Sequence, residues 1–181
     1  MENVYTPILR RIRDILSQNG YKIVKEDGVF YIMDGKPKIS EIIVQVTDKD
    51  VLLGKTRFSY ATLVNVDVFN VSWLNTHKKY EGQQLGTLLL IYAVCDLKMT
   101  HPNVNHVVLD DDTDKSRRMR NIYNKLGFSF RDFVCLGDKR GEVVMSGPEK
   151  QLELNDEFIS VVKKKLNIGK SRRYKVLKWK I

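Results

Sequence analysis

The sequence predicts a mixed α/β domain with antiparallel strands first, a central strand-helix-strand crossover next, and a closing hairpin last. Three observations predict it. β-branched runs separated by turn residues follow an opening amphipathic helix, a strongly apolar helix lies between two strand patterns, and the composition is that of a globular protein. The 181 residues are 43% hydrophobic and 29% charged, which suits one domain or one domain with a short appendage.

The first element is an amphipathic helix that ends at Gly20. Thr6 followed by Pro7 is typical of a capping residue and a first helical position. The apolar residues that follow recur on one helical face: Ile8, Ile12, Ile15 and Leu16.

Three apolar runs follow, Val29–Met33, Ile39–Val46 and Val51–Leu53, and each is predicted to be a strand. Turn compositions at 34–37 and 47–50 separate them. An antiparallel meander is therefore expected.

The stretch 63–74 contains a change of phase. One parity carries Val64, Val66 and Val68, and the other carries Phe69, Val71 and Trp73. An extra residue near Phe69, a β-bulge, would keep both sets on one face and leave a backbone group without a ladder partner. A strand buried on both faces, or a turn at 68–70, would explain the pattern equally well.

After a polar loop, Gly82 to Gly86 opens a helix that reaches about Met99, and this helix is apolar nearly all round. His101-Pro102 ends it, and Val104–Leu109 has the pattern of a buried strand. This order predicts a right-handed crossover joining two parallel strands.

Aspartates at 110–114 precede another helix, whose amides they can cap. Its apolar positions have helical spacing up to the stop at Gly127: Met119, Ile122, Tyr123 and Leu126. Phe128–Leu136 and Glu142–Met145, joined by a glycine-rich turn, are predicted to form the closing hairpin.

Gly147-Pro148 is the predicted boundary between a domain at 1–148 and a basic extension at 149–181. Asn155 is expected to cap a helix through Leu166, and alternation at 177–181 suits a half-buried strand. The extension carries ten Lys or Arg against four acids, and so six of the nine net positive charges. Such a surface at 163–180 is either a solvated face or a contact for nucleic acid or an acidic partner.

Metal, membrane and export functions find no support in the sequence. Cys95 and Cys135 are expected to be core thiols, and neither has a histidine at ligand spacing. The longest apolar run, Leu88–Cys95, is far shorter than the roughly 20 residues of a membrane span, and no signal-peptide pattern opens the chain. A cytoplasmic or nuclear protein is expected.

Two segments together resemble a known family. Tyr-Glu-Gly-Gln-Gln-Leu-Gly-Thr-Leu-Leu at 80–89 and Asn-Ile-Tyr-Asn-Lys-Leu-Gly-Phe at 121–128 resemble the signature segments of the GNAT superfamily of N-acetyltransferases. The resemblance covers about Ile39–Met145. It implies the acyl-CoA N-acyltransferase-like fold, in which a mixed sheet opens around acetyl-CoA.

The resemblance also implies roles for particular residues. The loop 82–87 would bind the pyrophosphate, the strand at 71–74 would lie beside the pantetheine arm, and an amide freed by the bulge would polarise the thioester carbonyl. Tyr123 would protonate the departing thiolate. The cofactor-binding residues implied are Trp73, Leu74, Gly82, Gln83, Gln84, Leu85, Gly86, Thr87 and Ser116.

Other assignments stay open. Asp67, Asn70 and His77 are each either a general base or an exposed polar residue, and Tyr123 is either the proton donor or a core side chain. Three positions depart from the family pattern: Glu81 replaces Arg or Gln, Gln84 replaces a glycine, and Ser116 replaces Asn.

The function that the resemblance implies is acetyl-CoA-dependent transfer of an acetyl group to a primary amine, directly within a ternary complex. The acceptor is either a protein amine or a small molecule. The alternative is a catalytically silent module of the same fold, which binds nucleic acid or an acidic partner through its basic extension.

Overall fold

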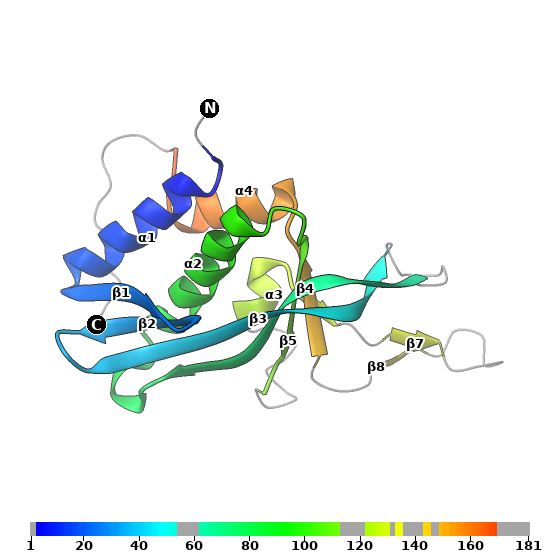
Figure 1. Cartoon of the computed structure of the whole chain (residues 1–181), viewed down its shortest axis with the longest axis horizontal. Helices are drawn as coiled ribbons and strands as arrows, with labels where there is room; N and C mark the ends of the chain where they lie inside the picture. Colours follow the sequence, from blue (N-terminus) through cyan, green and yellow to red (C-terminus); the bar gives the residue numbers. More distant parts are fainter. Residues whose placement is uncertain are drawn as a thin grey trace.

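The computed structural model describes residues 3–53, 62–112, 122–130, 133–135, 143–145 and 149–169. A seven-stranded mixed sheet in the order β1-β2-β3-β4-β5-β9-β6 forms its centre, and β7 and β8 form a separate pair (Figure 1). The predicted mixed α/β class is confirmed. The elements are α1 (Thr6–Gln18), β1 (Tyr21–Glu26), β2 (Val29–Asp34), β3 (Lys38–Leu53), β4 (Thr62–Thr76), a 3-10 turn η1 (Lys78–Tyr80), α2 (Leu85–Thr100), β5 (His106–Asp110), α3 (Ile122–Leu126), β6 (Ser129–Phe130), β7 (Phe133–Cys135), β8 (Val143–Met145), β9 (Glu149–Glu153) and α4 (Asp156–Lys165).

Helix α1 packs its apolar stripe against β1 and α2. The four predicted core positions of this helix are all buried. Its capping position is Tyr5 and not Thr6, which is already helical, so the predicted cap is wrong by one residue. The Asn3 side chain accepts a hydrogen bond from the Tyr5 amide at 2.9 Å and fixes the turn before the helix.

The amino-terminal sheet differs from the prediction in two places. β1 was not predicted, because its lysines interrupt the apolar alternation. β3 is one continuous strand, and not two strands separated by a turn at 47–50. These polar residues pair with the polar half of β4, for example Asp48 with Asp67, in a long two-stranded ribbon (Figure 1). Pairing with β4 therefore makes residues 47–50 a strand, and this pairing cannot be seen in the local sequence.

β4 is both buried on two faces and interrupted by a β-bulge. Val68 and Phe69 are buried on opposite faces, since Val68 packs with Val51 and Val108 while Phe69 belongs to the main core. The bulge lies farther along, where Val44 pairs with Val71 but Ile43 pairs with Trp73, so Ser72 is the extra residue. Trp73 is 51% exposed and not inward-facing.

The crossover is confirmed. α2 is buried on nearly all sides, and β5 runs parallel to β4. These two strands pair only over Phe69–Val71 with Val107–Leu109, and α2 lies across the sheet on the same face as α1 (Figure 1). Beyond the bulge, β4 has no pairing with β5, which opens the sheet at this point.

The carboxyl-terminal part adds a strand that was not predicted. β7 and β8 form the expected hairpin, but β9 enters the main sheet between β5 and β6. The predicted boundary at 147–148 is therefore followed at once by a central strand, and the described part of the extension shares the core. α4 begins as predicted, with the Asn155 side chain accepting from the Phe158 amide at 3.0 Å. Ser116, the hairpin turn at 137–141 and the tail at 170–181 lie outside the described residues.

Candidate functional site

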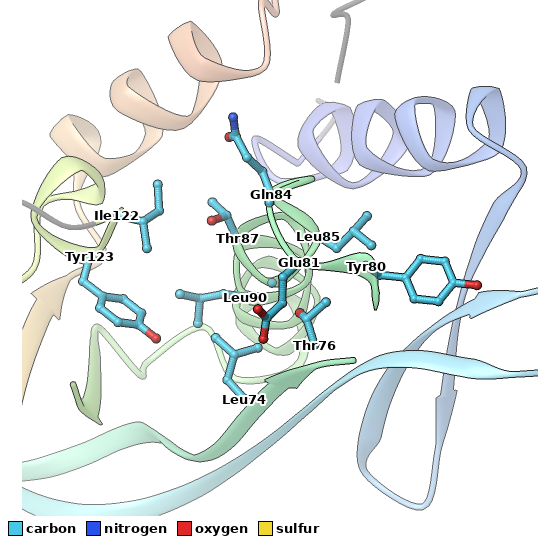
Figure 2. Close-up of a pocket in the computed structure, with 12 residues that line it drawn as sticks. Leu74, Thr76, Tyr80, Glu81, Gln84, Leu85, Thr87, Leu90, Ile122 and Tyr123 are labelled. Atoms are coloured by element: carbon cyan, nitrogen blue, oxygen red, sulfur yellow. The ribbon is translucent and has the colours of Figure 1, made fainter. Parts of the chain in front are cut away.

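A pocket of about 240 Å³ lies where the start of α2 faces the end of β4 and the helix α3 (Figure 2). We name it the α2 pocket. Its walls are Leu74, Thr76, Tyr80, Glu81, Gly82, Gln84, Leu85, Gly86, Thr87, Leu90, Ile122 and Tyr123. One end is therefore backbone at a helix start, and the other end is largely apolar.

The loop before α2 and the first turn of that helix line this pocket. Gly82 and Gln84 both have left-handed backbone conformations, with φ of 83° and 60°. Gln84 occupies the capping position, but its side chain makes no capping hydrogen bond. The amides of Leu85, Gly86 and Thr87 come at the start of the helix, where no intrahelical acceptor exists and the dipole is positive. A phosphate anion fits such a terminus.

Gly86 allows the helix start to approach β4. A Cβ added there would lie 3.4 Å from the Thr76 hydroxyl and 4.0 Å from a methyl group of Leu74. Thr76 is fixed in turn, because its hydroxyl lies 2.9 Å from that of Ser40 on β3. A larger side chain at position 86 would therefore project into the α2 pocket.

Gln84 stands where the family resemblance expects glycine, and its conformation explains that preference. A left-handed residue with a Cβ costs about 1–2 kcal/mol relative to the right-handed form, whereas glycine adopts it freely. The Gln84 side chain is exposed and points away from Leu74 and Tyr123 (Figure 2). It does not fill the apolar end of the pocket.

Tyr123 lies at the apolar end of the pocket, half-buried on α3. Its ring packs edge-on against Phe128, with centroids 5.7 Å apart. Burial raises the pKa of Tyr123 to about 12, and the carboxylates of Asp111 and Asp112 add to the effect. The hydroxyl therefore holds its proton throughout the neutral range.

A second space of about 580 Å³ opens between β4 and β5 past their last paired residues. We name it the β4–β5 cavity. Its lining residues are Lys49, Asn70, Val71, Ser72, Trp73, Leu74, Leu109, Asp110, Asp111, Asp112 and Tyr123. Leu74 and Tyr123 belong to both linings, so the two spaces meet at these side chains.

A buried ion pair lies behind Tyr123. The Lys150 ammonium on β9 lies 2.6 Å from an Asp111 carboxylate oxygen, and both side chains are fully buried. The same ammonium donates to the Asn124 side chain at 2.6 Å and lies 5.7 Å from the centre of the Tyr123 ring. The pair thereby ties α3 to the central strands.

Most of the residues predicted to bind the cofactor line these two spaces. Leu74, Gly82, Gln84, Leu85, Gly86 and Thr87 line the α2 pocket, and Trp73 lines the β4–β5 cavity. The Gln83 side chain points elsewhere, because it is buried and accepts a hydrogen bond from Tyr21.

The base candidates are placed differently from one another. Asp67 is exposed on the β3–β4 ribbon, and His77 is exposed with its Nδ1 accepting from the Lys79 amide at 3.4 Å. Neither lines the α2 pocket or the β4–β5 cavity, whereas Asn70 lines the cavity. Thr76, Leu90 and Ile122 were missed, since apolar or small residues inside regular elements carry no local signal of a site.

Within the part of the chain that the structure describes, no three or more His, Cys, Asp or Glu side chains gather as a metal site would require. No described helix has both the length and the apolarity needed to cross a membrane.

No protein-family model and no curated protein sequence matches the chain. Solved structures do. One titled as a bacterial toxin aligns with a TM-score of 0.50 and 17% identity over 79% of this chain and 73% of its own. The ribosomal-protein-S18-alanine N-acetyltransferase of Escherichia coli aligns with a TM-score of 0.44 and 15% identity over 83% and 90%. The Escherichia coli GNAT family N-acetyltransferase YhbS, in complex with CoA, aligns with a TM-score of 0.44 and 15% identity. This alignment covers 84% of this chain and 70% of YhbS.

The chain shares the overall fold of the bacterial toxin, with a TM-score of 0.50. The two segments that resemble GNAT signatures, 80–89 and 121–128, both contribute residues to the α2 pocket. The sheet also includes β1 and β9, which lie outside the segment that this resemblance covers.

Proposed function

We propose that the protein is an acetyl-CoA-dependent N-acetyltransferase that acts on a primary amine by direct transfer in a ternary complex. The α2 pocket is the observation that carries this proposal. It combines backbone donors for phosphate with an apolar end that reaches a protonated tyrosine.

The residues present fit the cofactor in parts. The amides at 85–87 would hold its pyrophosphate, and Leu74, Leu90 and Ile122 would pack against its apolar arm. Acetyl-CoA itself supplies an activated acetyl thioester. Tyr123 holds a proton on its hydroxyl at the far end, where a thiolate would need one.

The amine would approach through the β4–β5 cavity, because that space reaches Leu74 and Tyr123 from the other side. Asp110 and Asp112 are exposed on its wall and favour a cationic amine. Such an amine must lose its proton before attack, since an ordinary alkylamine is mostly protonated near pH 7.

Binding measured by calorimetry with acetyl-CoA and with CoA tests the proposal. Gly86→Leu should weaken binding by at least about tenfold, because its side chain would project into the α2 pocket. Gly86→Ala is the matched control, since its Cβ makes only an ordinary contact, and it should stay within about twofold of the unaltered chain.

One observation favours a second candidate, a binding module without catalysis. Glu81 places a carboxylate in the lining of the α2 pocket, where it repels phosphate, and Gln84 must hold a costly conformation. If the unaltered chain binds no cofactor at millimolar concentration but Glu81→Arg with Gln84→Gly does, the binding module is the better description. Strong binding by the unaltered chain would exclude it.

Nucleic-acid association through 163–180 stays a separate proposal. Lys163, Lys164 and Lys165 form the last turn of α4. A test should truncate the chain after Gly169 and not before Glu149, because β9 is a central strand. The truncated chain should also carry Lys163→Gln, Lys164→Gln and Lys165→Gln, so that all of the basic surface is removed. Loss of salt-sensitive retention on a polyanion column would support the proposal, and unchanged retention would contradict it.

A further inference from the structure

A pair of tyrosines joins the loop before α2 to the amino-terminal hairpin. Tyr21, the first residue of β1, is buried, and its hydroxyl donates to the Gln83 side-chain oxygen at 2.9 Å. Gln83 is itself only 8% exposed. This hydrogen bond spans 62 positions of sequence and is shielded from water.

The second tyrosine fixes the other side of the same loop. The Tyr80 hydroxyl donates to an Asp34 carboxylate oxygen at 2.7 Å. Asp34 is the β2 partner of Tyr21, so both anchors lie at one end of the β1–β2 hairpin. The rings of Tyr21 and Tyr80 also meet edge to face, with centroids 6.3 Å apart.

The loop at 82–84 contains backbone conformations that need support from the rest of the fold. Gly82 and Gln84, on either side of Gln83, are both left-handed. Gln84 is exposed and makes no capping hydrogen bond, so its own side chain does not stabilise this conformation. The neighbouring Gln83 side chain is fixed to another element, β1, by its hydrogen bond with Tyr21.

We propose that Tyr21 is a positioning residue for cofactor binding. Its hydrogen bond to Gln83 holds Gln84 in the left-handed conformation, and this conformation aims the amides at 85–87 into the α2 pocket. The inference rests on the proposed function for its ligand, but the positioning of the loop can be measured without any ligand.

Tyr21→Phe removes the hydroxyl and keeps the ring and its contact with Tyr80. It should weaken CoA binding by roughly 3- to 10-fold, the effect of one buried hydrogen bond. Gln84→Gly removes the need for an anchor, because glycine adopts the left-handed conformation without strain. In that background, Tyr21→Phe should change the affinity by less than about twofold.

Two further variants separate this role from general stability. Tyr31→Phe makes the same chemical change on the neighbouring strand β2 and should leave CoA affinity unchanged. Gln83→Met removes the acceptor of the hydrogen bond. It should reproduce the loss seen in Tyr21→Phe, and combining the two should add little. Thermal melts of each variant show whether the fold is kept.

Hydrogen exchange of the free protein supplies the second readout. Tyr21→Phe should speed exchange at 82–88 and leave the rest of α2 unchanged, while Tyr31→Phe should not. The positioning role is overturned, and the proposed function stands, in either of two cases. In the first, the unaltered chain binds CoA and Tyr21→Phe binds it with the same affinity. In the second, Tyr21→Phe weakens CoA binding equally with Gln84 and with Gly at position 84. If the unaltered chain binds no CoA, the proposed function fails and exchange alone decides. Faster exchange at 82–88 then supports the role, and unchanged exchange overturns it.

Discussion

The buried pair of Lys150 and Asp111 should be costly to break. Both side chains are fully buried, and their charged atoms lie 2.6 Å apart. Lys150→Met would leave a buried carboxylate without this ammonium, and removing one partner of a buried pair costs about 3–5 kcal/mol. For a chain of this size, about 2–4 °C of melting temperature corresponds to each kcal/mol, so the loss should be about 6–20 °C.

Urea and thermal unfolding of a double-mutant cycle measure this coupling. Asp111→Asn with Lys150→Met removes both charges and should recover about 2–4 kcal/mol relative to Lys150→Met alone. The exposed pair of Lys38 and Glu26, 3.2 Å apart, is the control, and Lys38→Met should leave the urea midpoint almost unchanged because water screens this pair. The reasoning is refuted if Lys150→Met unfolds within about 1 kcal/mol of the unaltered chain, or if the two changes are simply additive.

Three more outcomes are expected. Gln84→Gly should stabilise the fold by about 0.5–1 kcal/mol, since relief of the left-handed strain exceeds the added freedom of glycine when unfolded, and Gln84→Ala should not; equal stability of the two in urea would contradict this. Tyr123→Phe should lower the turnover number and leave the KM for acetyl-CoA nearly unchanged. Because the pKa of Tyr123 is raised to about 12 in the fold, stability should fall as pH rises above about 10, where the unfolded tyrosine ionises first, and Tyr123→Phe should lessen that fall in melts between pH 9 and 11. Cys95 is fully buried and burial raises the pKa of its thiol, so a Cys135→Ser variant should react with a thiol reagent only after unfolding; reaction of the native protein would contradict the packing.

The elements that the sequence predicted well are those whose patterns are local. Helix α2 is marked by its apolar residues and its opening glycines, and α4 by the Asn155 cap. The continuous β3 was missed because Asp48 and its neighbours resemble a turn unless their partners on β4 are known. β9 was missed for the same reason, since the partners that allow Lys150 to be buried, Asp111 and Asn124, lie 39 and 26 positions earlier in the chain.

The candidate site divides in the same way. The loop at 82–87 and Tyr123 were found from a short motif, and the structure brings them together in one pocket. The role of the Gln83 side chain could not be predicted, because its partner Tyr21 lies 62 positions away and belongs to a strand with a weak pattern. Trp73 was expected to face inward, but the bulge at Ser72 turns it outward, and its indole donates to Glu41 at 2.8 Å.

The place of β9 has a consequence for how the protein is made. While the chain is being synthesised, β5 has β4 on one edge, and its other edge must wait for a strand about forty residues downstream. At about 5–20 residues per second, the ribosome needs several seconds to supply that strand. During this interval, a buried-type strand with an open edge is a template for pairing between nascent chains, so yield in the cell should depend on translation speed and chaperones over this segment.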